Sequence, residues 1–260
     1  MSHTLIQDAL FTAKTVRDLD RLAIEKQGIP SIVLMKRAGR AVLSELLDAF
    51  GTPSLLNVFC GGGNNGGDGY IVAALAAEKK IAVRCFEMGG KLGADAAQAR
   101  QFAEQANVRF CSIDGSAELD QGVVVDSLLG IGLRGDLRQP YVDAIELING
   151  SGLPVVAVDI PSGLDSDTGA VRGAVVQADI TVTFIGAKQG LFSGRGVAVC
   201  GEIIYDSLEV DEELFSQVEA SAELMDLFNL LEQLPELDAD AYQTQRGHSM
   251  VVGGDHGFGG

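Results

Sequence analysis

Apolar residues recur along this chain at two different spacings, and the alternation of the two predicts alternating strands and helices. Near the N-terminus the spacing is helical, which predicts one helix over 15–27, with a capping-box-like start at Thr15-Val16-Arg17-Asp18, and another over 31–50. From Gly51 onward, short apolar runs alternate with glycine turns and further helical stretches. The expected strands are 55–59, 82–87, 108–112, 122–128, 154–159, 180–184 and 202–205, and the expected later helices are 68–79, 94–106 and 140–149.

Several of the expected strands are continuous apolar runs, such as Val123-Val124-Val125. Runs of this kind are typical of a parallel sheet that is covered on both faces. Strands that alternate with helices indicate right-handed βαβ units. The sequence therefore predicts an α/β, Rossmann-like, doubly wound fold with a mostly parallel sheet and helices on both faces, in a domain over 1–215.

The last part of the chain has a different pattern. Residues 216–240 are acidic and leucine-rich, and we expect them to be a linker. Residues 241–260 contain a short apolar stretch and a second glycine turn with no helix after it. We expect this segment to be the incomplete start of a second domain, too short to form an active site of its own.

The composition excludes several classes of function. The formal net charge is −17, so a broad basic face for nucleic acid or an anionic membrane is not expected. No apolar run approaches the roughly 18 residues of a membrane-spanning helix, and the N-terminus lacks a secretory pattern. The 4 cysteines include no CxxC pair, so we expect structural, reduced thiols. These features predict a soluble cytoplasmic protein.

Polar residues and glycines gather where four of the expected strands end. Gly61–Gly69 follow the first of these strands, and Gly130–Asp136 follow another. Asp159 and Ser162 follow the next strand, and Lys188 follows the one after it. The carboxyl ends of parallel strands share one edge of the sheet, and ligands bind there. We therefore expect one site at this edge.

The residue types at this edge limit the chemistry. All 3 histidines lie outside residues 16–205, which form the body of the domain, so acid–base work is left to carboxylates and lysine. The side-chain oxygens of Asn65, Asp126 and Ser162 could surround a hard cation. Alternatively, Asp126 and Asp159 each cap the turn that follows them, and Lys188 is an ordinary surface lysine. The sequence pattern by itself leaves both interpretations open.

The glycine loops also allow a different function. Gly61-x-Gly63-x-x-Gly66 follows a strand and matches the dinucleotide fingerprint, and Gly130-x-Gly132-x-x-Gly135 is a second match. Glu87, at the end of the next strand, could bind a ribose hydroxyl. An NAD-dependent dehydrogenase is therefore an alternative. Two asparagines inside the first loop, and the lack of a separate substrate domain, argue against it.

Four ordered motifs resemble the NAD(P)H-hydrate epimerase family, also called the YjeF N-terminal domain. They are GGGNNGGDGYIVA (61–73), VVDSLLGIGLRGD (124–136), VVAVDIPSGLDSDTG (155–169) and ADITVTFIGAKQGL (178–191). The resemblance covers about residues 10–210. The tail RGHSMVVGGDHGFGG (246–260) resembles the first strand and turn of a ribokinase-like, ADP-dependent NAD(P)H-hydrate dehydratase domain.

The resemblance implies an activity and a set of site residues. Members of the family interconvert the R and S forms of NADH or NADPH that is hydrated at C6 of the nicotinamide ring, so that a dehydratase can repair both. The matching positions imply a potassium ion bound by Asn65, Asp126 and Ser162. They imply substrate binding by Asn64, Asn65, Gly66, Gly67, Asp68, Gly130, Ile131, Gly132, Leu133, Arg134, Gly135, Asp136 and Asp159. A homodimer that works with an NAD(P)H-hydrate dehydratase is expected, with no nucleic-acid or membrane partner and no dehydratase activity in this chain.

The chemistry that the resemblance implies suits the available residues. The hydrate is a hemiaminal, and protonation of its hydroxyl lets water leave while the ring nitrogen donates its lone pair. Return of water to the other face inverts the carbon, which requires an acid and a base but no nucleophile or redox cofactor. We assign Asp159 as the acid–base residue and Lys188 as an assisting charge. A non-catalytic dimerising scaffold of the same family is a second alternative, although a scaffold has no chemical need for these residues.

Overall fold

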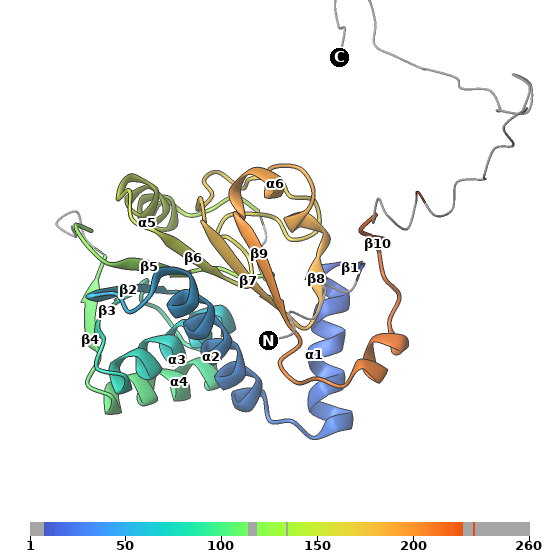
Figure 1. Cartoon of the computed structure of the whole chain (residues 1–260), viewed down its shortest axis with the longest axis horizontal. Coiled ribbons are helices and arrows are strands. Elements are labelled where there is room, and N and C mark those ends of the chain that lie inside the picture. The colour runs from blue at the N-terminus through green and yellow to red at the C-terminus, as the bar shows by residue number, and fades with distance from the viewer. Residues whose placement is uncertain (1–7, 114–118, 134, 226–230, 232–260) are drawn as a thin grey trace, which may run out of the picture. The chain divides into compact units, whose positions relative to one another are not determined.

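Seven parallel strands form the main sheet, in the order β4-β3-β2-β5-β6-β7-β9 (Figure 1). The computed structural model describes residues 8–113, 119–133, 135–225 and 231. The strands are β2 (Leu55–Cys60), β3 (Ala82–Glu87), β4 (Arg109–Ser112), β5 (Val123–Ser127), β6 (Val155–Val158), β7 (Ile180–Phe184) and β9 (Glu202–Asp206). The sheet grows outward from β2 in one direction and from β5 in the other. The pair β2–β5 is therefore the switch point at which open α/β sheets bind ligands.

Helices cover both faces of this sheet. α2 (Ser31–Phe50), α3 (Asn64–Glu78) and α4 (Ala94–Gln105) pack on one face, and α5 (Gln139–Gly150) packs on the other (Figure 1). Successive strand residues alternate between the two apolar layers, so that Val125 contributes to the α2–α4 side and Val124 to the α5 side. Every residue of β5, β6 and β7 is buried, as expected for a parallel sheet covered twice. The predicted Rossmann-like fold is confirmed.

The structure corrects two predicted helix starts. α1 spans Ala13–Gln27 and begins two residues before the predicted position, because the N-cap is Thr12, whose side chain accepts a hydrogen bond from the Thr15 N–H. α3 begins at Asn64, four residues before the predicted start at 68. The second half of the glycine-rich stretch is therefore helical. A side chain at some of these positions would collide with its neighbours, as a Cβ on Gly66 would with the Gly61 carbonyl oxygen. Glycine therefore lets the helix pack closely here.

A second sheet, which the sequence did not predict, has three short strands. β1 (Ala9–Phe11) pairs in parallel with β8 (Ala187–Lys188) and antiparallel with β10 (Ala222–Glu223). Strands of two or three residues carry too little periodicity to be recognised in a sequence. Since α1 follows β1 directly, this pairing fixes the start of α1 beside Lys188. The remaining short helices are η1 (Gln189–Leu191), α6 (Gly196–Val199) and η2 (Glu212–Gln217).

The chain divides into two units, Met1–Leu224 and Met225–Gly260. The features below belong to the described residues of the first unit. The predicted linker over 216–240 and the predicted second-domain start over 241–260 stay predictions, because most of residues 225–260 lie outside the described ranges.

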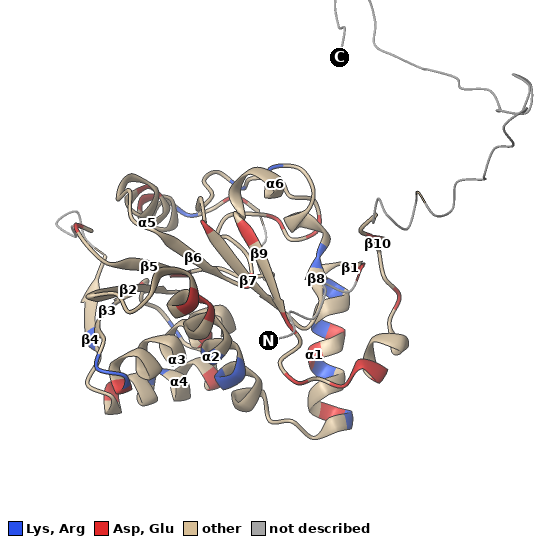
Figure 2. Cartoon of the chain, viewed as in Figure 1, with Lys and Arg blue, Asp and Glu red and all other residues tan. Residues whose placement is uncertain are grey.

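Basic and acidic residues are interspersed along α1, as the blue and red segments of its ribbon in Figure 2 show. On that helix they form pairs one turn apart, Lys14 with Asp18 and Arg21 with Glu25. Exposed pairs of this kind contribute little to stability, because water and salt screen their attraction. Among the described residues, no helix is both long and apolar enough to cross a membrane.

Candidate functional site

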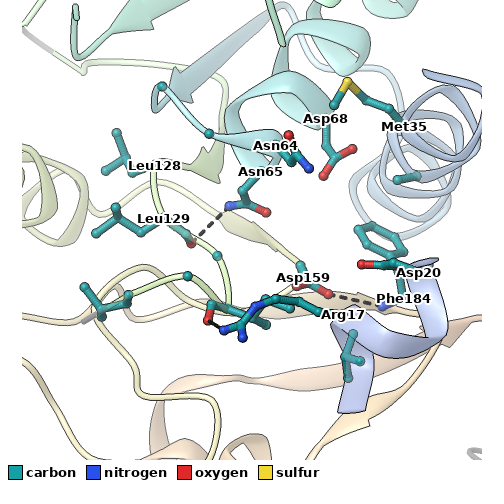
Figure 3. Close-up of a pocket in the computed structure, with 18 of the residues that line it drawn as sticks. Arg17, Asp20, Met35, Asn64, Asn65, Asp68, Leu128, Leu129, Asp159 and Phe184 are labelled. Carbon is teal, nitrogen blue, oxygen red and sulfur yellow. Dashed lines mark hydrogen bonds between the residues drawn. The ribbon is translucent and has the colours of Figure 1, made fainter. Parts of the chain in front are cut away.

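A cavity of about 940 Å³ opens at the carboxyl ends of the central strands. Residues that follow β2, β5, β6 and β7 form its floor, and α1 and α2 contribute a wall. Figure 3 shows side chains from α1, α3 and the end of β6 pointing into it. Small-molecule and cofactor sites occupy about 300–1,000 Å³. The cavity therefore has room for a nucleotide, at the edge of the sheet where the sequence predicted a site.

The glycine-rich stretch after β2 brings the start of α3 to this cavity. Gly62, Gly63, Asn64 and Asn65 line it. Gly63 is the N-cap of α3 and makes no side-chain capping bond. The first N–H groups of a helix have no partner within the helix, and the helix dipole adds partial positive charge there. A helix start that lines a cavity in this way is suited to a phosphate group.

Close packing explains the glycines of this stretch that do not face the cavity. A Cβ on Gly61 would lie 1.8 Å from the Leu128 carbonyl oxygen, and a Cβ on Gly66 would lie 1.9 Å from the Gly61 carbonyl oxygen. Gly66 and Gly67 are buried and do not line the cavity, although the sequence predicted that they bind substrate. Gly66 lets α3 start close to the end of β2, and Gly67 makes room for the Met35 side chain of α2.

The predicted second loop, Gly130–Asp136, forms another part of the wall. Its cavity-lining residues are Gly130, Ile131, Gly132, Leu133 and Asp136. Gly135 does not line the cavity, and Arg134 lies outside the described residues. Across the cavity, Arg17 Nη2 on α1 donates a hydrogen bond of 3.0 Å to the Ile131 carbonyl oxygen. This bond connects α1 to the loop after β5.

The three predicted cation ligands lie in one hydrogen-bonded network. Ser162 donates to both oxygens of the Asp126 carboxylate, from Oγ at 2.6 Å and from its N–H at 2.8 Å. The Leu129 N–H donates to Ser162 Oγ at 2.9 Å, and Asn65 Nδ2 donates to the Leu129 carbonyl oxygen at 3.0 Å (Figure 3). The network joins the end of β5, the start of α3 and the loop after β6.

Two features of this network fit a bound cation. Asn65 Oδ1 is buried without a hydrogen-bond partner, and an unsatisfied buried oxygen costs about 1–3 kcal/mol. Asp126 is fully buried, and burial raises its pKa to about 6 although hydrogen bonds from Ser162 and Leu128 lower it. A hard cation with oxygen ligands would satisfy Asn65 Oδ1 and favour the ionised form of Asp126. The described residues contain no group of three or more His, Cys, Asp or Glu that could hold a metal ion.

Asp159 and Lys188 form an ion pair at the floor of the cavity. Lys188 Nζ donates to Asp159 Oδ1, to Thr183 Oγ1 at 3.1 Å and to the Phe184 carbonyl oxygen at 3.0 Å. The Lys188 side chain is 0% exposed, so its charge is balanced by protein groups rather than by bulk water. Lys188 is therefore not an ordinary surface lysine.

The backbone at Asp159 has an uncommon conformation. Its φ is 68°, in the left-handed region that non-glycine residues rarely adopt. The Asp159 N–H donates to the Val182 carbonyl oxygen at 2.7 Å, and Asp159 Oδ1 accepts from the Phe184 N–H at 3.3 Å (Figure 3). Strained residues persist where the surroundings fix them, and they cluster at functional sites.

Two further carboxyl groups face the same space, Asp20 from α1 and Asp68 from α3 (Figure 3). Burial raises the pKa of Asp20 to about 6, with Lys188 lowering it and Asp159 adding to the rise. Burial also raises the pKa of Asp68 well above its usual range, and the negative charges of Asp159 and Asp20 raise it further. The negative charge of Asp159 thus disfavours ionisation of Asp20 and of Asp68, and the charge of Lys188 opposes this effect at both residues.

The sequence interpretation missed Asp20 and Arg17, which both line the cavity. A signal for Asp20 was present in the pattern of α1. The residues four before it and three after it, Val16 and Ala23, are both buried. A charged residue on the apolar stripe of an amphipathic helix departs from the usual pattern and can mark a functional position.

Glu87, the proposed ribose ligand of a dehydrogenase, is engaged elsewhere. Its Oε1 accepts a hydrogen bond of 2.8 Å from the Tyr70 hydroxyl and one of 2.6 Å from Arg100 Nε. Glu87 does not line the cavity. The residue on which the dehydrogenase alternative depended is thus part of an internal ion pair between β3 and α4.

Known proteins resemble this chain over most of its length. A family model described as YjeF-related protein N-terminus matches residues 31–190. The bifunctional NAD(P)H-hydrate repair enzyme Nnr of Coxiella burnetii is 39% identical over 96% of this chain and 52% of its own length. The enzyme of the same name from Escherichia coli is 36% identical over 98% of this chain and 50% of its own length. This chain therefore spans about half the length of these bifunctional relatives.

A shorter relative matches almost from end to end. The NAD(P)H-hydrate epimerase of Limosilactobacillus fermentum is 36% identical over 74% of this chain and 93% of its own length. The crystal structure of yeast YNL200c has a TM-score of 0.67, covering 84% of this chain and 99% of that chain. Its identity of 18% means that it shows the shared fold alone.

Proposed function

Because the chain belongs to the family of YjeF-related protein N-termini, we propose that it interconverts the R and S forms of hydrated NADH and NADPH. The observation that most supports this function is the arrangement at the cavity floor. A buried ion pair, Asp159–Lys188, lies beside the carboxyl groups of Asp20 and Asp68. Such a set can move protons at one carbon atom, which is what this epimerisation requires.

The start of α3 is the proposed pyrophosphate site. Gly62–Asn65 line the cavity, and the first N–H groups of the helix provide donors and partial positive charge. This local charge explains how a protein with a net charge of −17 would bind an anionic dinucleotide. The nicotinamide end would then lie toward Asp159 and Lys188, and the loop Gly130–Leu133 would enclose the substrate between them.

At the reacting end, we propose that Asp159 exchanges a proton with the C6 hydroxyl or with the incoming water. Lys188 is fixed by three acceptors and balances the negative charge of Asp159. The φ of 68° at Asp159 turns the chain so that this side chain points into the cavity (Figure 3). The ion pair therefore holds the carboxylate in one orientation, which reduces the entropy lost when substrate reacts.

We also propose a potassium ion at Asn65, Asp126 and Ser162. The unsatisfied Asn65 Oδ1 and the buried Asp126 carboxyl support this site. When bound, the ion would supply positive charge beside the start of α3, where the pyrophosphate is proposed to lie. The homodimer, the cytoplasmic location and the cooperation with a separate dehydratase stay predictions.

A coupled assay tests the proposed function. The R hydrate is mixed with this chain, with an S-specific dehydratase and with the ATP or ADP that the dehydratase requires. Recovery of the reduced nicotinamide ring is followed by absorbance. The wild-type chain should accelerate recovery, and Asp159→Asn should lower kcat by about 10²–10⁴-fold. The matched control is Asp143→Asn, an exposed carboxylate on α5 outside the cavity. A wild-type chain that leaves recovery at the spontaneous rate would refute the function and favour the scaffold alternative.

A further inference from the structure

We infer that Asp20 is a second catalytic residue, which exchanges a proton with the substrate from a different wall of the cavity than Asp159. The inference rests on the proposed function and extends it. Asp20 precedes residues 31–190, the segment that the family model matches. Its carboxyl group reaches the cavity from α1, whereas Asp159 reaches it from the end of β6 (Figure 3).

Three connections hold α1 against the site. β1 pairs with β8, which contains Lys188. The Ala13 N–H, in the first turn of α1, donates to Asp167 Oδ1 at 2.6 Å. One turn before Asp20, Arg17 donates to the Ile131 carbonyl oxygen at 3.0 Å. These contacts come from the loops after β5 and β6 and from β8, so the position of Asp20 is set by the same strand ends that form the site.

The Asp20 carboxyl group is available to a substrate. It lines the cavity and makes no hydrogen bond or ion pair with any described residue. The charged groups that face it are Arg17 on its own helix, Asp68 on α3, Asp159 after β6 and Lys188 on β8. A carboxyl group that burial has left without a partner gains most from a hydroxyl or water placed beside it.

Titration separates Asp20 from Asp68. Burial raises the pKa of Asp20 to about 6, with Lys188 and Arg17 lowering it and Asp159 raising it. Burial and two negative neighbours raise the pKa of Asp68 well above its usual range. A group that must both give and take a proton works best when its pKa lies near the working pH. Asp20 meets this condition, whereas burial and the negative charges of Asp159 and Asp20 favour the neutral form of Asp68, which can donate a hydrogen bond.

The proposed step balances with two carboxyl groups. One carboxyl group donates its proton to the C6 hydroxyl, the C–O bond breaks with its electron pair on oxygen, and water leaves. The ring-nitrogen lone pair forms the C=N bond. A water molecule then adds to C6 from the other face, the C=N electrons return to nitrogen, and the second carboxylate takes the released proton. In the reverse direction Asp20 and Asp159 exchange roles, and solvent restores the protonation of each between turnovers.

The test compares Asp20→Asn with Asp68→Asn and with Asp18→Asn, an ion-paired carboxylate on the same helix outside the cavity. Wild-type activity is measured first in the coupled assay, so that failure of the proposed function is recognised separately. Asp20→Asn should lower kcat by about 10²-fold or more while KM changes only a few-fold, and Asp18→Asn should leave both unchanged. The wild-type kcat should bend near pH 6, and this bend should be absent in Asp20→Asn but present in Asp68→Asn.

Circular dichroism and the thermal midpoint establish that each variant is folded. If the wild-type chain is active, a kcat of Asp20→Asn within about threefold of wild type would overturn the inference, since a general acid or base contributes about 10²–10⁴-fold. The inference would also be overturned if the bend of kcat near pH 6 persisted in Asp20→Asn or disappeared in Asp68→Asn. Should Asp20→Asn fail to fold, a flat wild-type kcat through that pH range would overturn the inference. A bend near pH 6 that persists in Asp126→Asn would support it, because Asp126 is the other carboxyl group at the site whose pKa is raised to about 6.

Discussion

Replacement of Asp20 by asparagine should make the protein more stable at alkaline pH and leave it almost unchanged at acid pH. In the folded chain burial raises the pKa of this carboxyl group to about 6, from an ordinary value of 3.8. The fold therefore favours the neutral form, and ionisation of Asp20 counts against folding. This cost is small below the unfolded pKa, grows as the pH rises from 3.8 to 6, and is fully present above pH 6.

The magnitude follows from the shift of the pKa. A difference of 2.2 between folded and unfolded values corresponds to about 3 kcal/mol near pH 8 and to about 0.5 kcal/mol near pH 4. Asp20 retains some contact with solvent, so the expected gain for Asp20→Asn near pH 8 is about 1–3 kcal/mol. In a domain of this size that gain raises the thermal midpoint by roughly 2–12 °C.

Urea unfolding at both pH values measures the effect. Asp18→Asn is the control with the opposite sign, because hydrogen bonds from Lys14 and Arg21 lower the pKa of Asp18 and its carboxylate favours folding. Asp20→Asn should raise the free energy of unfolding near pH 8 and not near pH 4, and Asp18→Asn should not raise it at either pH. A loss of stability in Asp20→Asn near pH 8, or an equal gain at both values, would show that the carboxyl group is not destabilised by burial.

Two further predictions concern the framework of the site. Gly66→Ala should lower the free energy of unfolding by about 2–3 kcal/mol, because its Cβ would lie 1.9 Å from the Gly61 carbonyl oxygen. A Cβ at Gly150 would meet nothing within 4 Å, so Gly150→Ala should change the free energy of unfolding by no more than about 0.5 kcal/mol in the same urea titration. Equal effects of the two would contradict the close packing at α3. Asp167→Ala should cost about 1 kcal/mol and lower kcat several-fold, because it removes the acceptor of the Ala13 N–H that fixes α1. Asp167→Asn keeps an acceptor oxygen and should recover most of both losses; no difference between the two variants would refute the role of this bond.

The sequence predicted the strands and the location of the site correctly where a single strong pattern determined the structure. The buried central strands were predicted within one or two residues because continuous apolar runs allow few other interpretations. The gathering of Asn65, Asp126, Ser162, Asp159 and Lys188 at one edge followed from the topology of a parallel sheet. The sequence did not reveal that Lys188 is buried. Lys188 belongs to β8, and both β8 and its partner strand β1 are too short to leave a periodic pattern.

The start of α3 and the role of α1 could not be predicted for a similar reason. Tertiary packing overrides the low helix propensity of glycine, so the helix begins at Asn64 inside a stretch that resembles a loop. On α1, Asp18 and Asp20 look alike in the sequence, but they lie about 200° apart around the helix. Only the fold shows that Asp18 is paired on the surface while Asp20 faces the cavity.

Direct observation of the two hydrates tests the central claim without a coupled enzyme. Pure R hydrate and pure S hydrate are incubated separately with a small fraction of their amount of this chain, and the two forms are separated by chromatography over time. We predict that both samples reach the same mixture, with the same rate constant, well before matched samples in buffer. If both samples change no faster than in buffer, this chain is not an epimerase of hydrated nicotinamide cofactors.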